Sequence, residues 1–475
     1  MLDLIIRGGD VVTPQGVAKC DLAIKGETIA AAAAPGTLAD GDAARVIDAA
    51  GKIVMPGGID PHVHMQHPFM VPDGTILYTQ GPDRVGMAAL YGGTTTLIDF
   101  AYMSADKSVQ AAIEARDADF APKSPCDWAY HLMLSSEPPH TQFAELAEAI
   151  QAGYPTIKIF TTNIWPHRTG RMIDFGDIWE TFKVLAKQGG LGVIHAEDND
   201  IVMHMYDKLF RENRTGFENM AEVHNALSED LSFRRVLRLA ESVPGTALYM
   251  MHVSAATGVA AIREARAKCL PVYGESLHQY MLHTAEDYKL PNGQIYHTYP
   301  SLKSAEDQKA LWQGTLDGAI NCVATDELCC TLREKTLGRR IDDTTGGNSG
   351  VEPRLGVMYT EMVMRRGYSL RQYVDLVSTN AAKIMGLYPR KGAIATGSDA
   401  DITILDPSRR GKVRKEDLHE TDYTPWEGHD IFAWPVVTIL RGNVVVENGT
   451  YSGREGAGKY LKRKIPADII AGPLL

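Results

Sequence analysis

The stretch GGIDPHVHM (residues 57–65) joins a short apolar run to two histidines that stand two positions apart. In extended backbone, residues i and i+2 point to the same face. We therefore expect His62 and His64 to point together, as two ligands of one metal ion must. Paired histidines also occur as ordinary surface or core residues, so a metal site requires further ligands elsewhere in the chain.

Seven more apolar runs with strand character follow the first. They are TTTLIDFAY (94–102), DWAYHLMLS (127–135), PTIKIFTT (155–162), LGVIHAED (191–198), ALYMMHVS (247–254), LPVYGES (270–276) and INCVATDE (320–327). Helical patterns separate them, at 108–120, 141–153, 178–189, 229–243 and 258–269. Eight strands alternating with helices predict an α/β protein, a (β/α)8 TIM-type barrel. A doubly wound open sheet is the alternative, but no G-x-G-x-x-G follows the first strand.

Similar β segments lie at the two ends of the chain. IIRGGDVVTPQG (5–16) resembles ILRGNVVVENG (439–449), more than four hundred residues later. This predicts a small β-sandwich domain formed from both termini, residues 1–56 plus 395–460, with the barrel, residues 57–394, inserted between them. Residues 461–475 form a C-terminal tail that is a possible subunit contact.

Composition limits the partners. The 475 residues carry a net charge of -11 and no long basic stripe, which argues against nucleic acid or an anionic membrane as a partner. The six cysteines show no C-x-x-C spacing and fit reduced thiols. The N-terminus lacks the features of a secretory signal, and no run reaches the roughly 18 apolar residues of a membrane span. We expect a cytoplasmic protein.

Polar residues stand near the ends of several predicted strands. In a (β/α)8 barrel the chemistry takes place at the C-terminal ends of the strands. Each residue alone has an ordinary explanation; an aspartate there, for example, can cap a helix. Together they predict a metal centre. The residues are His62, His64, Lys158, His195, His252 and Asp326.

Lys158 is the most informative of these residues. Strand alternation in PTIKIFTT points its side chain toward the barrel axis together with Thr156 and Phe160. Burial lowers the pKa of an amine and favours its neutral, nucleophilic form. Such an amine can add CO2 to form a carbamate, whose two oxygens can bridge two divalent metals. The alternative is a structural ion pair with Glu197 or Asp198.

With these six residues in this order, the chain resembles the cyclic amidohydrolases, most closely the hydantoinase and dihydropyrimidinase branch. The resemblance extends through the terminal β segments. The motifs that carry it are H-x-H at 62 and 64, KIF (158–160), HAE (195–197), TGFENMAEVHNALSE (215–229), HVSA (252–255), GESLHQY (274–280) and TD (325–326).

The resemblance implies a binuclear centre, usually of zinc with manganese as an alternative, in a barrel that carries a split β-sandwich and commonly assembles as a homotetramer, with a dimer also possible. It implies that a metal-bridging hydroxide opens a cyclic amide. The implied ligands are His62, His64 and Asp326 for one metal, His195 and His252 for the other, and N6-carboxylysine at Lys158 between them. Asp326 is also the implied catalytic proton carrier.

The chain departs from the family where substrate is bound. Hydantoinases usually carry a tyrosine five residues after the bridging lysine, and Asn163 stands there. Tyr299 occupies the place of a small residue, and Asn348 matches the family's asparagine that contacts the substrate ring. With Trp165, these are the predicted substrate contacts. Glu327 follows Asp326, where histidine or asparagine is more familiar.

Several functions stay open on the sequence. The substrate is expected to be a small cyclic ureide or imide, which also admits allantoinase-like and dihydroorotase-like enzymes. A mononuclear deaminase of the same superfamily places a proton-transferring glutamate after the strand-five histidine, and Glu197 stands at that position. A non-catalytic scaffold homologue is the alternative that is not an enzyme.

Overall fold

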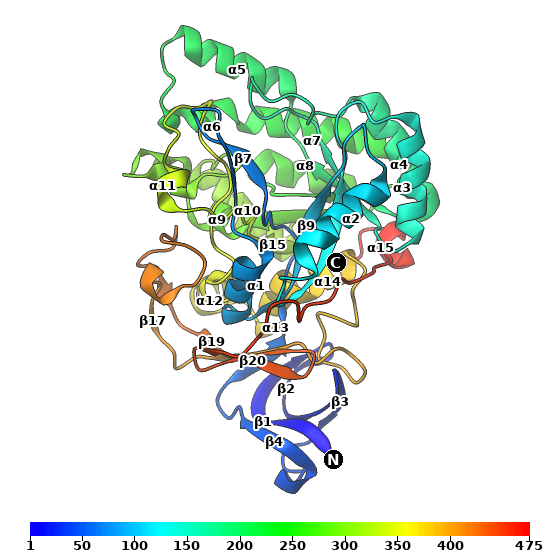
Figure 1. Cartoon of the computed structure of the whole chain (residues 1–475), viewed down its shortest axis with the longest axis vertical. Coiled ribbons are helices and arrows are strands. Elements are labelled where there is room, and N and C mark those ends of the chain that lie inside the picture. The colour runs from blue at the N-terminus through cyan, green and yellow to red at the C-terminus, as the bar shows by residue number, and fades with distance from the viewer.

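The computed structural model describes residues 1–475, and its larger part is a barrel of eight parallel strands (Figure 1). Neighbouring strands follow one another in chain order. The strands are β6 (Gly58–Asp60), β9 (Thr94–Tyr102), β10 (Asp127–Met133), β11 (Thr156–Phe160), β12 (Leu191–His195), β13 (Ala247–Met250), β14 (Val272–Leu277) and β15 (Cys322–Ala324).

The first and last strands meet through the segments that follow them. Val63 forms a parallel bridge with Glu327, and the amide of His64 donates to the carbonyl of Glu327 at 2.7 Å. Every predicted strand is present, and the (β/α)8 architecture is confirmed. One detail differs: β6 ends at Asp60, so the H-x-H segment is the extended continuation of the strand rather than part of its regular ladder.

Helices cover the outside of the barrel. All five helical patterns named above form helices, and three further long helices lie outside them: α1 (Pro82–Tyr91), α5 (Asn199–Arg211) and α10 (Ala305–Asp317). Their start signals are present in the sequence, since Pro82 begins α1, Asp198 caps α5, and Ser304 and Asp307 form a capping box on α10. The longer helices are α1 (Pro82–Tyr91), α2 (Val109–Phe120), α3 (His140–Gln151), α4 (Phe175–Gln188), α5 (Asn199–Arg211), α7 (Ala226–Glu241), α8 (Ala256–Ala267) and α10 (Ala305–Asp317).

Shorter elements complete the chain. A two-stranded hairpin, β7 (Pro68–Met70) and β8 (Ile76–Tyr78), follows the H-x-H segment, and a second small pair is formed by β17 (Gly411–Lys412) and β18 (Asp430–Ile431). The short helices are α6 (Met220–Val223), α9 (His278–Leu282), α11 (Leu332–Lys335), α12 (Arg354–Tyr359), α13 (Leu370–Val374), α14 (Asn380–Ile384) and α15 (Ala467–Ala471).

Both termini contribute to one nine-stranded sheet, which lies below the barrel in Figure 1. Its order is β21-β20-β19-β16-β5-β1-β2-β3, with β4 paired to β1. N-terminal and C-terminal strands meet where β5 runs antiparallel to β16. The strands are β1 (Leu2–Thr13), β2 (Gly16–Lys25), β3 (Thr28–Ala33), β4 (Ala43–Asp48), β5 (Ile53–Pro56), β16 (Ile402–Asp406), β19 (Trp434–Leu440), β20 (Asn443–Glu447) and β21 (Thr450–Tyr451).

The C-terminal tail, residues 461–475, packs against the barrel of its own chain. Leu461, Ile465 and Ile469 are buried. The hydroxyl of Tyr273, near the start of β14, donates to the carbonyls of Ile469 at 2.8 Å and Gly472 at 2.7 Å. The tail therefore lies at the end of the barrel opposite the strand ends that carry the histidines. A subunit contact by the tail stays a prediction.

The barrel is held by one large apolar core. A single cluster of 103 buried residues includes side chains from the strands and from the helices around them. Burial on this scale supplies most of the driving force for folding. No helix of the chain is both long enough and apolar enough to cross a membrane.

Candidate metal centre

His62, His64 and Asp326 converge where the first and last strands meet. The Oδ1 atom of Asp326 lies 3.0 Å from Nε2 of His62 and 3.2 Å from Nε2 of His64. One ligand atom from each residue lies within 4.8 Å of the other two. Two imidazole nitrogens and one carboxylate oxygen facing one another are a suitable donor set for a divalent cation such as zinc.

His195 and His252 form a pair beside the group of His62, His64 and Asp326. Nδ1 of His195 lies 3.0 Å from Nε2 of His252, and the ring centroids of His62 and His252 are 5.4 Å apart. His252 and Asp326 both have positive φ angles, 37° and 52°. This backbone conformation is costly for residues other than glycine and is concentrated at functional sites. Here it accompanies side chains that converge on the same cavity.

The amine of Lys158 lies in the same cavity and has no carboxylate partner. Its side chain is about 1% exposed, and its only hydrogen-bond partner is the sulfur of Met251 at 2.8 Å. Nζ also lies 4.6 Å from the centroid of the Phe160 ring. Desolvation lowers the pKa of Lys158 to about 7. A buried amine without an anionic partner has the properties that carbamate formation requires.

The alternative of an ion pair at Lys158 is wrong. Glu197 accepts hydrogen bonds from two histidines, and Asp198 caps α5 and pairs with Arg235 at 3.0 Å. Neither carboxylate is paired with the lysine. The residues present thus fit a divalent metal centre with an amine beside it that no carboxylate neutralises.

Two buried glutamates orient the histidines. Glu275 lies 2.8 Å from Nδ1 of His62 and also accepts a hydrogen bond from Tyr249 at 2.8 Å. The charges of Asp326 and Glu275 outweigh desolvation and raise the pKa of His62 to about 9. A carboxylate on the far nitrogen of a histidine fixes its tautomer and orientation, as is common at metal sites.

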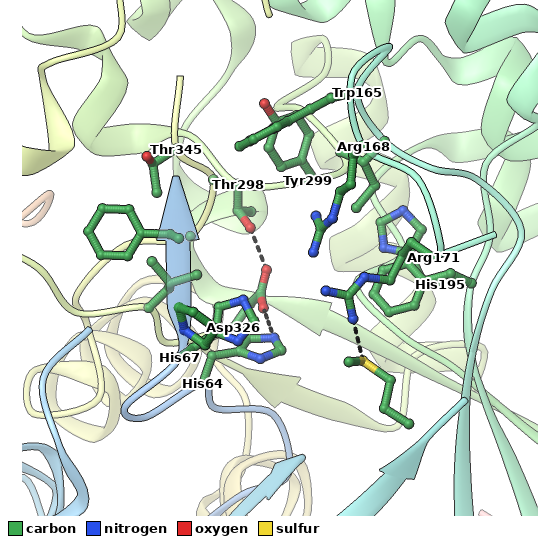
Figure 2. A pocket seen from close by; sticks show the side chains of 18 of the residues that line it. His64, His67, Trp165, Arg168, Arg171, His195, Thr298, Tyr299, Asp326 and Thr345 are labelled. Carbon is green, nitrogen blue, oxygen red and sulfur yellow. Dashed lines mark hydrogen bonds and ion pairs between the residues drawn. The ribbon is translucent and has the colours of Figure 1, made fainter. Parts of the chain in front are cut away.

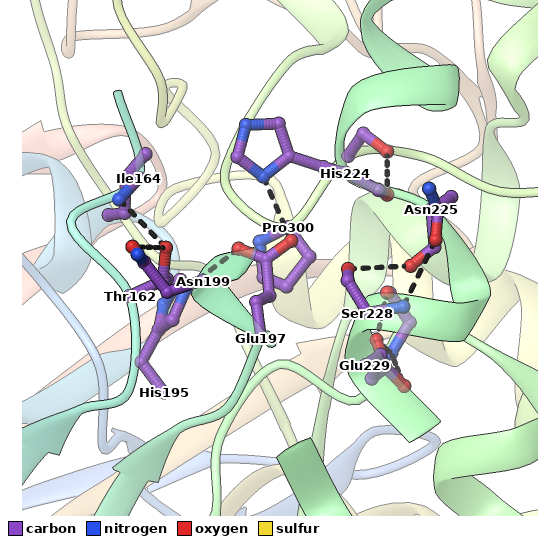
Figure 3. A network of polar contacts seen from close by, with 12 residues as sticks. Thr162, Ile164, His195, Glu197, Asn199, His224, Asn225, Ser228, Glu229 and Pro300 are labelled. Atoms are coloured by element: carbon purple, nitrogen blue, oxygen red, sulfur yellow. Dashed lines mark hydrogen bonds and ion pairs between the residues drawn. The ribbon is translucent and has the colours of Figure 1, made fainter. Parts of the chain in front are cut away.

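On the other side, Glu197 lies between two histidines (Figure 3). Its oxygens lie 2.9 Å from Nε2 of His195 and 2.8 Å from Nδ1 of His224. Although desolvation acts in the opposite direction, the hydrogen bonds and charges of these histidines hold the pKa of Glu197 well below its usual range. The sequence analysis missed the roles of Glu275 and His224, although both lie in motifs that carry the family resemblance.

A cavity of about 330 Å³ opens above the histidines (Figure 2). Of the four predicted substrate contacts, Trp165 and Tyr299 line it, and Asn163 and Asn348 do not. Other lining residues are His67, Phe69, Tyr102, Phe160, His167, Arg168, Arg171, Thr298 and Leu328. The wall is therefore rich in aromatic groups. It also carries two arginines, Arg168 and Arg171, that were not among the predicted site residues.

The side chain of Asn163 is engaged within its own loop. Its Oδ1 accepts hydrogen bonds from the backbone amides of Arg171 at 3.3 Å and Met172 at 3.0 Å. Asn348 is buried, and neither polar atom of its side-chain amide has a hydrogen-bond partner. The Tyr299 hydroxyl donates to the carbonyl of Thr344 at 2.9 Å, so it is the ring that faces the cavity.

Asp326 and its neighbour Glu327 each accept hydrogen bonds from other segments of the chain. The hydroxyl of Thr298 donates to Oδ2 of Asp326. Glu327, whose position differs from the family pattern, accepts hydrogen bonds from the amides of Gly350 at 2.8 Å and Val351 at 3.0 Å. Glu327 does not line the cavity, so its departure from the pattern affects loop structure rather than the cavity wall.

Comparison with known proteins agrees with this geometry. Residues 53–445 match the model of the Amidohydrolase family. A D-hydantoinase of Rhizobium radiobacter is 33% identical, with 98% of this chain and 99% of that protein covered. A D-hydantoinase of Geobacillus stearothermophilus is 34% identical, with 97% and 96% covered.

Solved structures are similar over the same length. The crystal structure of dihydropyrimidinase from Brevibacillus agri NCHU1002 superposes with a TM-score of 0.92 at 32% identity, covering 98% of this chain and all of that one. L-Hydantoinase from Arthrobacter aurescens gives a TM-score of 0.85 at 26% identity, with 98% and 100% covered. With its barrel, its terminal sheet and its converging histidines, the chain belongs to the amidohydrolase family.

Proposed function

We propose that this protein is a metal-dependent hydrolase that opens a cyclic amide, a hydantoin-like or dihydropyrimidine-like ureide or imide. The single observation that carries the proposal is the buried amine of Lys158, which lies beside four histidines without a carboxylate partner. Relatives similar over nearly the whole chain are D-hydantoinases and a dihydropyrimidinase, which supports the same reaction.

The cofactor is proposed to be two divalent metal ions, zinc in the first place and manganese as the alternative. His62, His64 and Asp326 would hold one ion, and His195 and His252 the other. Lys158, as N6-carboxylysine, would bridge them. Such a pair, when bound, lowers the pKa of water and polarises a carbonyl oxygen, which is the chemistry that amide hydrolysis requires.

The chain itself supplies a proton carrier and an enclosed site. Asp326 is proposed to accept the proton of the attacking water and to pass it to the departing ring nitrogen, as a general base and then a general acid. The hydroxyl of Thr298, which donates to Oδ2 of Asp326, holds the carboxylate in position. Aromatic walls formed by Trp165 and Tyr299 suit a flat ring and exclude water from it.

The competing functions have weaker support. A deaminase needs a glutamate free to transfer protons, but both carboxylate oxygens of Glu197 are engaged by His195 and His224. A non-catalytic scaffold has no need of a complete set of ligands, and all six positions are filled here. Allantoinase-like and dihydroorotase-like activities share the chemistry and differ in the ring.

The substrate contacts and assembly are proposals as well. Trp165 and Tyr299 are the direct ring contacts we propose. Asn348 would act from behind the cavity wall, next to Gly347, which lines the cavity, and Asn163 would act through the loop that it holds. All six cysteines are free, which agrees with a cytoplasmic location. A homotetramer, with a dimer as the alternative, is proposed from the family resemblance.

The test combines metal analysis with a substrate panel. The protein is loaded with zinc or manganese, and metal per chain is measured by elemental analysis. Ring opening is then assayed on hydantoins, dihydrouracil, allantoin, dihydroorotate and cyclic imides. Two metals per chain with hydrolysis of at least one ring supports the proposal. One metal per chain with deamination, or two metals with no ring opened, would refute it.

A further inference from the structure

Two arginines face the cavity from the loop that follows β11. Arg168 and Arg171 both line it, and Figure 2 shows their guanidinium groups pointing into the space in front of Asp326. Both side chains are partly buried. They place two positive charges beside the position where a bound ring would react.

Neither arginine forms an ion pair. The side chain of Arg168 has no hydrogen-bond partner and lies with its guanidinium carbon 5.8 Å from the centroid of the Trp165 ring. The guanidinium of Arg171 donates only to the sulfur of Met133, at 3.0 Å, and lies 5.2 Å from the centroid of the Phe160 ring. Two other partly buried arginines of this chain pair with carboxylates: Arg7 with Asp21 at 3.6 Å and Arg371 with Asp375 at 2.9 Å.

The acidic group closest to this space is already engaged. The carboxylate of Asp326 faces His62 and His64 through Oδ1 and accepts a hydrogen bond from Thr298 through Oδ2. Two desolvated positive charges that repel each other are costly unless an anion joins them. Desolvation and the charge of Arg171 lower the pKa of Arg168 to about 9, which leaves the group charged at neutral pH.

The departure at Asn163 explains how the arginines reach this place. Asn163 stands where the family pattern has a tyrosine. Its side-chain oxygen accepts hydrogen bonds from the backbone N–H groups of Arg171 and Met172. The backbone N–H of Asn163 donates to Oδ1 of Asn199 at 3.1 Å. These bonds close the loop that carries both arginines and attach its start to α5. The amide of Ile173, just after the arginines, donates to the carbonyl of Phe160 in β11 at 2.9 Å.

We infer that Arg168 and Arg171 bind an anionic substituent of the substrate, so that the physiological ring is a cyclic amide carrying a carboxylate or a phosphate-like group. Guanidinium groups recognise such oxyanions through paired, charge-assisted hydrogen bonds. The inference rests on the proposed function, because it names the substrate class of the same site.

The experiment compares substrates that differ only in charge. Hydantoin-5-acetic acid and 5-(phosphonomethyl)hydantoin are the anionic probes, and hydantoin-5-acetamide is the uncharged one. The metal-loaded protein is tested as wild type, Arg168→Met, Arg171→Met and the double variant. Arg333→Met is the matched control, because Arg333 is exposed and lies outside the cavity.

The expected result is a selective loss. The wild type should prefer an anionic ring in kcat/KM, and each cavity variant should lose about 10- to 100-fold on that ring, the range expected for a charge-assisted contact. Hydrolysis of the amide should change less than about threefold. The KM for the anionic ring should also rise with salt, and that for the amide should not. A preference between the two anions identifies which group the site takes.

Two outcomes would overturn the inference. Equal losses on the acid and the amide would assign the arginines to stabilising charge on the ring carbonyl instead. A wild type that opens the amide as well as or better than both anions would remove the need for an anionic substituent. Each leaves the proposed function intact, whereas a protein with two metals that opens no ring of either kind refutes the proposed function itself.

Discussion

Nζ of Lys158 lies 2.8 Å from Sδ of Met251, and this weakly accepting thioether is the only hydrogen-bond partner of a buried amine. A thioether does not neutralise an ammonium group. The environment therefore favours the uncharged amine, which is the form that reacts with CO2. The proposed binuclear centre depends on this property of Lys158.

Replacing Lys158 with methionine tests that dependence. Methionine is similar in length and suits an apolar environment but cannot form a carbamate, so the fold should persist. We expect metal per chain to fall from two to one or fewer, and kcat/KM to fall at least about a thousandfold because the paired ions are lost. Elemental analysis measures the first effect, and ¹³C NMR after labelling with ¹³C-bicarbonate should show a carbamate signal in the wild type alone. Lys187→Met, at an exposed position, is the control; two metals in Lys158→Met would contradict the assignment.

Asp326→Asn separates metal binding from proton transfer. The amide keeps an oxygen that can face His62 and His64 but cannot accept a proton at neutral pH. Most of the metal should remain, and kcat should fall by about a hundredfold to ten-thousandfold, the usual contribution of a general acid or base. Steady-state assays and metal analysis of the same sample test this. A variant with near-wild-type turnover would exclude Asp326 as the proton carrier.

Glu197→Gln and Glu275→Gln test the carboxylates behind the histidines. Glu197 orients His195, and Glu275 orients His62. We expect each change to weaken metal affinity by about 10- to 100-fold, because the outer hydrogen bond of a liganding histidine raises its basicity and fixes its ring. Competition with a metal-sensitive dye measures the effect. Glu114→Gln on the exposed face of α2 should leave affinity unchanged, and the same loss in this control would show that the effect is not local.

The free energy of unfolding should depend on pH through Glu361, which does not line the cavity. Although desolvation opposes it, hydrogen bonds and charges from His429, Arg366 and Arg365 lower the pKa of Glu361 to about 2. A carboxyl whose pKa is lower in the folded state stabilises the fold above its unfolded pKa, 4.5, and this contribution is lost as the pH falls toward 2.

Glu361→Gln should therefore be less stable than the wild type at pH 7, by about 1–2 kcal/mol once solvent screening of the partly exposed arginines is considered. The difference should be present at pH 7 and decrease as the pH falls below 4.5. Urea unfolding of both proteins at several pH values measures it. A difference that persists undiminished at pH 3.5 would rule out Glu361 as its source.

The order of elements could be predicted from sequence because both faces of a barrel strand are buried. Runs such as TTTLIDFAY (94–102) and DWAYHLMLS (127–135) are apolar almost throughout, and they form β9 and β10. The terminal sheet could be recognised because its two halves share a local pattern. Strand lengths were harder to predict from sequence. β6 and β15 have only three residues each, because the extended segments near the barrel mouth leave the regular hydrogen-bond ladder.

The candidate site divides in the same way. Residue type and position at strand ends were enough to select His62, Lys158 and Asp326, since few other reasons bring such groups to one end of a barrel. The sequence could not decide between a free amine and an ion pair at Lys158, because the answer depends on whether the Glu197 side chain points toward the lysine or toward His224.

The barrel, the terminal sheet and the residues at the mouth of the barrel could be inferred without a structure, since periodicity and residue chemistry are local properties of a chain. Three features are visible only in the folded chain: Glu275 supports His62 from 213 residues away, Asn163 holds a loop, and Arg168 and Arg171 face the cavity without carboxylate partners. Hydrogen bonds and ion pairs form only when donor and acceptor atoms are placed to within a few tenths of an ångström and point toward each other. That direction is set by packing between segments far apart in sequence.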